Sequence, residues 1–407
     1  MKYRLNNNVY LVRGKVRSCI YNLNNSKLYS INSALANKIE IANLEGIDED
    51  SLDDELKTLF DNFVEEGILD LTETMSPHEI KEIASPDYGC VFAWIEITNR
   101  CNLKCLHCYN ESDVHCDSIM SFENYKRVVD NLVAFGVKKV QIIGGEPLVE
   151  KKLLRRMLEY TVEKFSFIEI FTNGTLITPE WVEFFAQNNI HIALSVYSYK
   201  KEEHDRVTGV IGSWERTNKT IYELKNRNVS YRVCNVLMKG ISLGEKSTDL
   251  YELSCEKDVV RMSGRANFSL LSDELIRKKL ITKEKFRSPI KRNFCSMLLS
   301  GHNCFNNKIY VSADMKVYPC VMERRLVHCD ISDGSQIVLD ETIRKFNKDQ
   351  IKECCECEYR YACHDCRPNS LSEEITEKPW FCTYIPGQGE WQDVDNFIKE
   401  LKEKWSD

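Results

Sequence analysis

Three closely spaced cysteines, Cys101, Cys105 and Cys108, constrain this chain more than any other feature. Their spacing is C-x3-C-x2-C, and they follow an apolar run at residues 91–97 that is typical of a buried strand, so we expect them on the loop after that strand. Three thiolates can hold three irons of a [4Fe-4S] cube and leave the fourth iron open. An open iron suits a reaction with a chelating small molecule better than electron transfer alone. The alternative is a zinc site with His107 as its fourth ligand.

Small and polar residues stand at the carboxyl ends of three further apolar runs, at residues 140–143, 167–171 and 192–194. They are Gly144, Gly145 and Glu146 after the first run, Thr172 and Asn173 after the second, and Ser195 after the third. Because the carboxyl ends of parallel strands meet at one edge of a sheet, we expect these residues near the three cysteines.

The region around these motifs alternates short apolar runs with amphipathic stretches. The apolar runs are residues 92–98, 139–143, 167–171, 191–196, 230–237 and 259–262. Helices are expected between them, for example at residues 121–135, with Ser121 as the N-cap, and at residues 213–227. Six strand–helix repeats predict an α/β fold with a parallel sheet, and right-handed crossovers would curl the strands into a barrel.

The motifs together resemble those of the radical S-adenosylmethionine (SAM) enzymes. The resemblance implies a six-stranded partial (β/α)6 TIM-like barrel over residues 91–270. It also implies that the open iron binds SAM and that an electron from the cluster cleaves SAM to methionine and a 5'-deoxyadenosyl radical. The SAM contacts implied by the resemblance are Gly144, Gly145 and Glu146 at the methionine ammonium, Thr172 and Ser195 near the ribose, and Arg206 at the carboxylate. Asn173 is a further implied SAM contact. An ordinary surface salt bridge is the alternative for Arg206.

Residues 1–75 have a different pattern. Strands are expected at residues 9–13, 18–23 and 27–31, and helices at residues 33–44 and 51–67. The pattern resembles the PqqD-like winged-helix module that recognises leader peptides of ribosomally synthesised, post-translationally modified peptides (RiPPs). The resemblance implies a free strand edge that binds the leader of a precursor peptide. A purely structural module is the alternative, and residues 76–90 are expected to be a linker.

Residues 271–407 contain a second group of cysteines, which resembles the SPASM extension of peptide-modifying radical SAM enzymes. That extension carries two auxiliary [4Fe-4S] clusters. By resemblance, Cys295, Cys304, Cys320 and Cys366 would hold the first, and Cys354, Cys357, Cys363 and Cys382 the second. Met315 and the short Cys363–Cys366 spacing depart from the common pattern, but the segment resembles a sub-branch that includes grasp-with-spasm maturases. Without Cys295 the first cluster would have an open iron, and two structural zinc sites are the alternative.

Composition is consistent with a cytoplasmic enzyme. The net charge of -7, with no basic patch, argues against a nucleic-acid partner. No apolar window is long enough for a membrane span, and the amino terminus lacks a signal-peptide core. Eighteen cysteines in such a chain favour metal ligation over disulfides.

The sequence therefore predicts a radical SAM maturase that installs an intramolecular cross-link, thioether or carbon–carbon, in a RiPP precursor. Its cofactors would be SAM and three [4Fe-4S] clusters, and its partners a leader-bearing precursor and an electron donor of the flavodoxin or ferredoxin type. The alternatives are a SPASM enzyme that modifies a folded protein, of the sulfatase or quinone-cofactor maturase type, and a non-catalytic iron–sulphur electron carrier. No catalytic side chain is assigned.

Overall fold

The computed structural model describes residues 1–76, 78–79, 90–242, 256–286, 290, 295, 297–299, 301–302 and 304–405. The predicted linker at residues 76–90 lies outside these ranges except at residues 76, 78, 79 and 90. The chain divides into two compact units. One comprises Met1–Asp87, Leu280–Asn303 and Lys345–Asp407, and the other Tyr88–Lys279 and Cys304–Arg344. We call them the terminal unit and the sheet unit.

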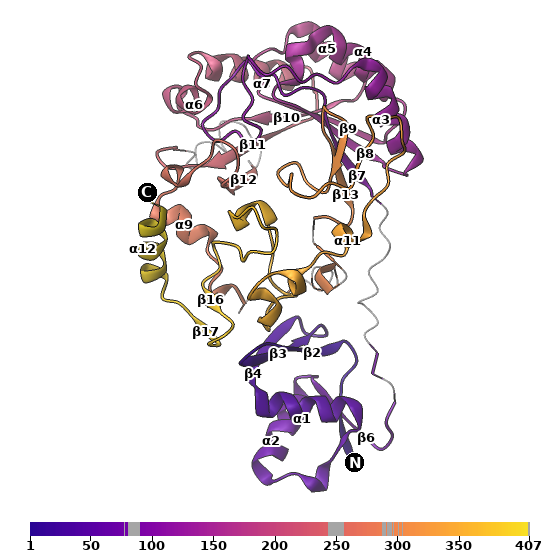
Figure 1. Ribbon diagram of the computed structural model, residues 1–407, viewed down its shortest axis with the longest axis vertical. Helices are drawn as coiled ribbons and strands as arrows, with labels where there is room; N and C mark the ends of the chain where they lie inside the picture. Colours follow the sequence, from indigo (N-terminus) through magenta and orange to yellow (C-terminus); the bar gives the residue numbers. More distant parts are fainter. Residues whose placement is uncertain are drawn as a thin grey trace. The chain divides into compact units, whose positions relative to one another are not determined.

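The sheet unit is built on a nine-stranded sheet (Figure 1). In spatial order its strands are β12 (Glu256–Val259), β11 (Tyr231–Leu237), β10 (His191–Ser195), β9 (Phe167–Thr172), β8 (Lys139–Ile143), β7 (Phe92–Glu96), β13 (Lys308–Val311), β14 (Lys316–Tyr318) and β15 (Cys329–Asp330). Every pairing from β12 to β13 is parallel, and the last two pairings are antiparallel.

The sheet is larger than the sequence predicts, because it has nine strands rather than six. The extra strands β13 to β15 lie in the region assigned to the cysteine-rich extension, and β13 pairs with β7 along Lys308–Val311. The sequence predicts a strand at residues 259–262. Strand β12 instead begins at Glu256 and ends at Val259, the residue at which the predicted strand begins. The closing of the strands into a partial barrel stays a prediction.

Helices connect the parallel strands and pack against the sheet (Figure 1). The connecting helices are α3 (Phe122–Ala134), α4 (Lys151–Thr161), α5 (Pro179–Gln187), α6 (Lys201–Thr208) and α7 (Ser213–Asn226). Two shorter helices, α9 (Asp273–Lys279) and α11 (Glu341–Arg344), follow β12 and β15. The Ser121 side chain accepts a hydrogen bond from the Asn124 amide, which confirms the predicted N-cap of α3. Apolar side chains such as Val128 and Leu132 on α3 are fully buried. Each buried side chain of this kind stabilises the fold by about 1.5–3 kcal/mol.

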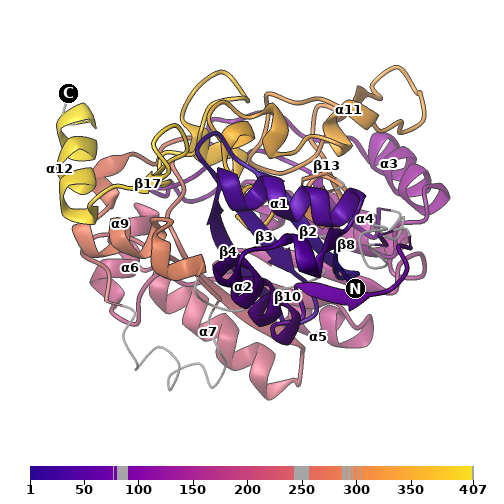
Figure 2. The same cartoon turned by 90° about the horizontal axis from the view of Figure 1, so that it is seen from below.

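The amino-terminal part of the terminal unit contains two small sheets. One has the order β2 (Val9–Arg13), β3 (Arg17–Asn22), β4 (Lys27–Asn32), and the other β5 (Ile47–Asp48), β1 (Lys2–Leu5), β6 (Leu69–Thr72). Helix α1 (Ser33–Leu44) packs against both, and α2 (Asp54–Glu65) lies beside it (Figure 2). Strands β2 to β4 and helix α1 confirm the predictions, whereas β1, β5 and β6 were not predicted.

The carboxy-terminal part of the terminal unit has little regular structure. Its elements are the 3-10 turns η5 (Lys348–Gln350), η6 (Cys354–Glu356) and η7 (Arg367–Ser370), the hairpin of β16 (Tyr384–Ile385) and β17 (Glu390–Trp391), and helix α12 (Val394–Trp405). The amphipathic pattern of residues 393–405 predicts a helix, and α12 confirms it. Within the same unit, the Tyr21 hydroxyl on β3 donates a hydrogen bond to the Glu358 carbonyl at 2.9 Å. This hydrogen bond ties the irregular carboxy-terminal segment to strand β3 of the same unit.

Candidate active site at the carboxyl ends of the parallel strands

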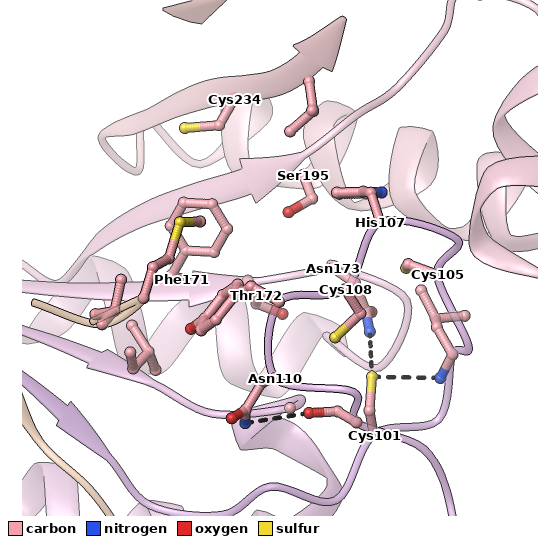
Figure 3. Close-up of a pocket in the computed structure, with 18 of the residues that line it drawn as sticks. Cys101, Cys105, His107, Cys108, Asn110, Phe171, Thr172, Asn173, Ser195 and Cys234 are labelled. Atoms are coloured by element: carbon pink, nitrogen blue, oxygen red, sulfur yellow. Dashed lines mark hydrogen bonds between the residues drawn. The ribbon is translucent and has the colours of Figure 1, made fainter. Parts of the chain in front are cut away.

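Most of the predicted site residues of the sheet unit surround one cavity of about 450 Å3 (Figure 3). The predicted residues that line it are Cys101, Cys105, Cys108, Gly144, Gly145, Thr172, Asn173 and Ser195. All of them lie at or just beyond the carboxyl ends of β7 to β10. The volume is in the range of small-molecule and cofactor sites, roughly 300–1,000 Å3.

The cysteine loop is fixed by backbone hydrogen bonds to the end of helix α6. The amides of Lys104 and Leu106 donate to the carbonyls of Thr208 and Val207, both at 2.9 Å. On its other side, the cysteine loop packs closely on Gly264. A Cβ at this position would lie only 2.4 Å from the Cys108 carbonyl oxygen. The loop is therefore positioned by the fold before any ligand binds.

The three thiols of this loop point into the same part of the cavity (Figure 3). Burial, with a contribution from the nearby Glu146, raises the pKa of Cys101, and burial raises the pKa of Cys105 to about 12. Thiols with raised pKa values become ligands when a metal displaces their protons. Among the described residues, no three cysteine, histidine or carboxylate side chains are close enough to enclose a single ion. In a cubane each thiolate binds a different iron, so the donor set fits a cluster.

The Gly144–Gly145 loop packs directly on the chain that leads into the cysteine loop. A Cβ at Gly144 would lie 2.5 Å from the Thr98 carbonyl oxygen, and one at Gly145 would lie 2.3 Å from that of Arg100. The Gly145 amide also donates to the Thr98 carbonyl at 2.8 Å. Both glycines are thus required by this close approach, in addition to any role toward a ligand.

Glu146 is fully buried and does not line the cavity. Its carboxylate accepts hydrogen bonds from the amides of Leu148 at 3.0 Å and Asn173 at 2.7 Å and from the Thr172 hydroxyl at 2.8 Å. Burial raises its pKa to about 7, although these hydrogen bonds oppose the shift. Glu146 therefore ties the loop after β8 to the end of β9, and its contact with the SAM ammonium stays a prediction.

Asn173 links the end of β9 to the cysteine loop. Its side-chain amide donates to the Asn102 side chain at 3.0 Å and lies 4.0 Å from the Cys101 sulfur (Figure 3). Arg206, in contrast, does not line the cavity, since it is exposed on α6 and donates to the Gly240 carbonyl. The structure thus brings Asn173 to the site and leaves Arg206 outside it.

The sequence did not predict Tyr197, Arg232 and Cys234 in the cavity lining, and it indicated His107 only as an alternative zinc ligand. His107 and Tyr197 pack edge to face, with ring centroids 4.7 Å apart. On β11, Arg232 and Cys234 line the cavity from one face, and the Arg232 guanidinium donates to the Cys234 sulfur at 3.0 Å. The two-residue period of a strand was the available signal, because every second residue of β11 faces the same side.

A buried carboxylate, Glu169, binds Arg232 of the cavity lining. Glu169 on β9 accepts two hydrogen bonds from Arg232, both at 2.8 Å, and pairs with His191 at 2.9 Å. Burial alone would raise the pKa of Glu169, but Arg232, His191 and Gln141 lower it to about 2. Glu169 is therefore a fixed anion that holds Arg232 toward the cavity.

The second predicted auxiliary set lies within the terminal unit. Cys354, Cys357, Cys363 and Cys382 are close enough to perturb one another electrostatically. Burial raises the pKa of each of Cys354, Cys357 and Cys382. Four convergent thiols fit the ligand set of a second cubane.

A buried ion pair, Asp365 with Arg367, and the His302 ring beside it fix the chain between Cys363 and Cys366. Asp365 pairs with Arg367 at 2.6 Å and with His302 at 3.4 Å, and all three side chains are nearly inaccessible to solvent. Arg367 also donates to the carbonyls of Ile375 and Glu377. This ion cluster positions the short segment that departs from the common spacing.

The first predicted auxiliary set is divided between the units. Cys304 and Cys320 belong to the sheet unit, whereas Cys295 and Cys366 belong to the terminal unit. Cys295 is fully buried in an apolar cluster with Tyr10 and Cys19, and burial raises its pKa to about 12. The assignment of these four cysteines to one cluster stays a prediction.

Comparisons with known proteins identify the region around the cavity. Residues 95–250 match the sequence model of the family described as the Radical SAM superfamily. A similar curated protein is the antilisterial bacteriocin subtilosin biosynthesis protein AlbA of Bacillus subtilis, 33% identical over 50% of this chain and 44% of AlbA. The chain thus spans less than half of AlbA. The AdoMet-dependent heme synthase of Methanosarcina barkeri is 24% identical over 75% of this chain and 99% of its own.

Solved structures extend the likeness of fold to almost the whole chain. Streptococcus suis SuiB bound to S-adenosylmethionine matches with a TM-score of 0.55 at 15% identity, over 90% of this chain and 96% of SuiB. The protein anSMEcpe with bound AdoMet and a peptide matches with a TM-score of 0.53 at 17% identity, over 77% of this chain and 96% of its own. Within the part of the chain that the structure describes, every helix is too short or too polar to cross a bilayer. The sequence likeness thus centres on residues 95–250, which include the cysteine loop and the double-glycine loop of the cavity.

Proposed function

We propose that this chain is a radical SAM enzyme that installs an intramolecular cross-link, thioether or carbon–carbon, in a ribosomally synthesised precursor peptide. One observation carries the proposal: three thiols, a double-glycine loop and the polar ends of β9 and β10 surround a single cavity within the radical SAM domain. Cys101, Cys105 and Cys108 would hold the cluster, and Gly144, Gly145, Thr172, Asn173 and Ser195 would contact SAM. When bound, the cluster and SAM supply a 5'-deoxyadenosyl radical that removes a hydrogen atom from an unactivated carbon.

The chain's own residues would position the reactants and exclude water. Glu146 and Asn173 fix the carboxyl end of β9 beside Cys101. Phe171, Ile143 and Val236 supply apolar lining, which protects a reactive radical from solvent. Arg232 of the lining is paired with the buried Glu169 at 2.8 Å, so its positive charge is neutralised within the protein.

The amino-terminal module would bind the leader of the precursor. Strand β4 pairs with β3 on one side, and no other described strand pairs with it. Such an edge offers backbone groups to an added peptide strand. SuiB, whose fold covers 93% of this chain in its complex, was solved bound to the precursor peptide SuiA, and AlbA carries the name of a bacteriocin biosynthesis protein.

The auxiliary cysteine sets would hold two further [4Fe-4S] clusters, and a cytoplasmic donor of the flavodoxin or ferredoxin type would supply electrons. Closing a link removes two hydrogen atoms from the peptide: one leaves as a hydrogen atom, and the other as a proton plus an electron. The electron would pass to an auxiliary cluster. SAM is the oxidant overall, so the product should be lighter than the precursor by two hydrogens for each link.

The test is a Cys101, Cys105, Cys108 to Ala triple variant after anaerobic reconstitution. It should keep about two thirds of the iron of the parent protein, because two of three cubanes remain, but form no 5'-deoxyadenosine from SAM. The parent protein, with precursor, SAM and reductant, should form 5'-deoxyadenosine and a peptide that has lost two hydrogens by tandem mass spectrometry. A triple variant that still cleaves SAM would show that the cluster is elsewhere.

The alternatives predict different results. A non-catalytic electron carrier would take up iron but release no 5'-deoxyadenosine. A maturase of folded proteins would not need the amino-terminal module for substrate affinity. A modified peptide of unchanged mass would exclude cross-linking in favour of epimerisation.

A further inference from the structure

One buried lysine lies against the second auxiliary cysteine set. Lys348 is only 4% exposed, and its ammonium donates hydrogen bonds to the Cys363 sulfur at 2.9 Å and to the His364 carbonyl at 3.4 Å. A capping box holds its turn, because the Asn347 side chain accepts from the Asp349 amide at 2.8 Å and Gln350 accepts from the Asn347 amide at 2.6 Å. The position of Lys348 is therefore fixed by the local fold.

The ammonium lacks the partner that a buried charge requires. Among the described residues, no carboxylate lies within 4 Å of it, and the nearby Asp365 is already held by Arg367 and His302. An unpaired buried cation is strongly unfavourable. Within the described part of the chain, the side-chain atom that accepts a hydrogen bond from the Lys348 ammonium is the Cys363 sulfur.

Two other lysines of this segment, Lys352 and Lys378, pair with carboxylates. Lys378 pairs with Glu353 at 3.0 Å, and Lys352 is an exposed side chain that pairs with Glu374 and Glu377. Lys348 alone of these three donates to a sulfur. Its charge is directed at the cluster site rather than at a carboxylate.

We propose that Lys348 is the internal counter-ion of the cluster held by Cys354, Cys357, Cys363 and Cys382, and that it raises the reduction potential of that cluster. The inference rests on the proposed ligand set. A cubane with four thiolates is an anion, and one added electron makes it more negative, so a fixed cation and its hydrogen bond to a ligand sulfur stabilise the reduced form. No bond breaks in this step, and the proton stays on the lysine nitrogen. The electron released by ring closure would thus have a favoured acceptor.

The experiment is a redox titration of the reconstituted full-length protein, followed by electron paramagnetic resonance. The signal of the second auxiliary cluster is the one absent from Cys357→Ala. Lys348→Met should shift the reduction equilibrium of this signal at least tenfold toward the oxidised form, which is about 59 mV for one electron. Lys352→Met, the matched control, should leave it unchanged, and Lys348→Arg should keep it near the parent value.

Each result decides the matter. A Lys348→Met protein with full iron and an unchanged potential overturns the inference. If Lys348→Met loses the cluster and Lys348→Arg retains it, the positive charge is needed at this position. If both variants lose the cluster, the shape of the lysine side chain matters and not its charge, and the inference is wrong. If Cys357→Ala retains all its iron, the ligand set itself is wrong and the inference fails with it.

Discussion

Two buried carboxylates of the sheet unit, Glu146 and Glu169, have pKa values shifted in opposite directions. Glu169 faces Arg232 and His191, and the pKa is lowered to about 2 despite burial. Glu146 accepts neutral donors only, and burial raises its pKa to about 7. The difference arises because a nearby cation favours the ionised form, whereas three neutral donors do not fully replace water.

Glu146 should make stability depend on pH. Because the folded pKa is above the unfolded value of 4.5, the folded state keeps a proton that the unfolded state has released between about pH 4.5 and 7. The free energy of unfolding should therefore fall as pH rises through this window, by up to about 3 kcal/mol. Glu146→Gln should flatten this slope in denaturant unfolding of the reconstituted protein. Equal slopes for parent and variant would contradict the predicted shift.

The residues that line the cavity show what sequence spacing can and cannot predict. Cys101, Gly144 and Ser195 could be predicted, because each follows an apolar run and so marks the end of a strand. Tyr197 could not, since its place depends on which segments become its neighbours. For Arg232 the strand period indicates a face of β11, but it does not indicate the partner Glu169 on β9. Spacing also could not show that Glu146 is turned away from the cavity, because Thr172 and Asn173 bind it from the next strand.

At the scale of elements, the turn between β2 and β3 contacts the segment that carries Cys357. The Lys15 amide donates to the Glu356 carbonyl at 2.8 Å, and the Arg360 guanidinium donates to the Arg13 carbonyl at 2.7 Å. Gly14 permits this approach, because a Cβ there would lie 2.9 Å from the backbone of both Glu356 and Glu358. The hairpin therefore covers the second auxiliary set.

Gly14→Val should disturb that set while sparing the cavity. The added side chain must push the backbone around Cys357 away, so we expect loss of about a third of the iron, the share of one cubane in three. SAM cleavage should persist. Gly387→Ala is the matched control, because its nearest new contact would be 3.9 Å away. Full iron content in Gly14→Val would show that the hairpin does not support the cluster.

The sequence predicts a helix or strand correctly where a local pattern of capping or apolar residues marks it. Helix α1 and the central strands β8 and β9 have clear caps or β-branched runs, and each was found within a residue. Strands β1 and β6 were missed because they are short and stabilise each other from opposite ends of the module, with Leu5 opposite Leu69. A pattern read along the chain contains no information about such distant partners.

At the scale of the whole molecule, the cavity is lined by the sheet unit alone. Deletion of residues 1–75 should therefore leave SAM cleavage in place. Leader affinity should be lost, and iron of the Cys354, Cys357, Cys363, Cys382 set should decrease, because its covering hairpin is removed. Calorimetric titration with a leader peptide, iron analysis and 5'-deoxyadenosine assay would measure the three effects. A truncated protein that binds the leader as tightly as the parent would show that the module is structural.

The division into units follows contacts that the sequence order hides. The sequence predicts boundaries at residues 75, 90 and 270, in order along the chain, whereas each compact unit is assembled from separated segments. Strand β13 illustrates the reason. The sequence predicts a strand pair at residues 308–312 and 317–320 within the cysteine-rich extension, and only the pairing of Lys308–Val311 with β7 shows that β13 continues the parallel sheet.

That pairing has a consequence for how the protein is made. Strand β7 lies between β8 and β13, and Tyr310 on β13, which donates to Glu96 at the end of β7, follows it by 214 residues. At about 5–20 residues per second, the ribosome needs roughly 10 to 40 s to deliver the second neighbour. During that interval one edge of β7 has unpaired amides and carbonyls, which can pair with other nascent chains. The yield of native protein will thus depend on how well the cell shields this edge during translation.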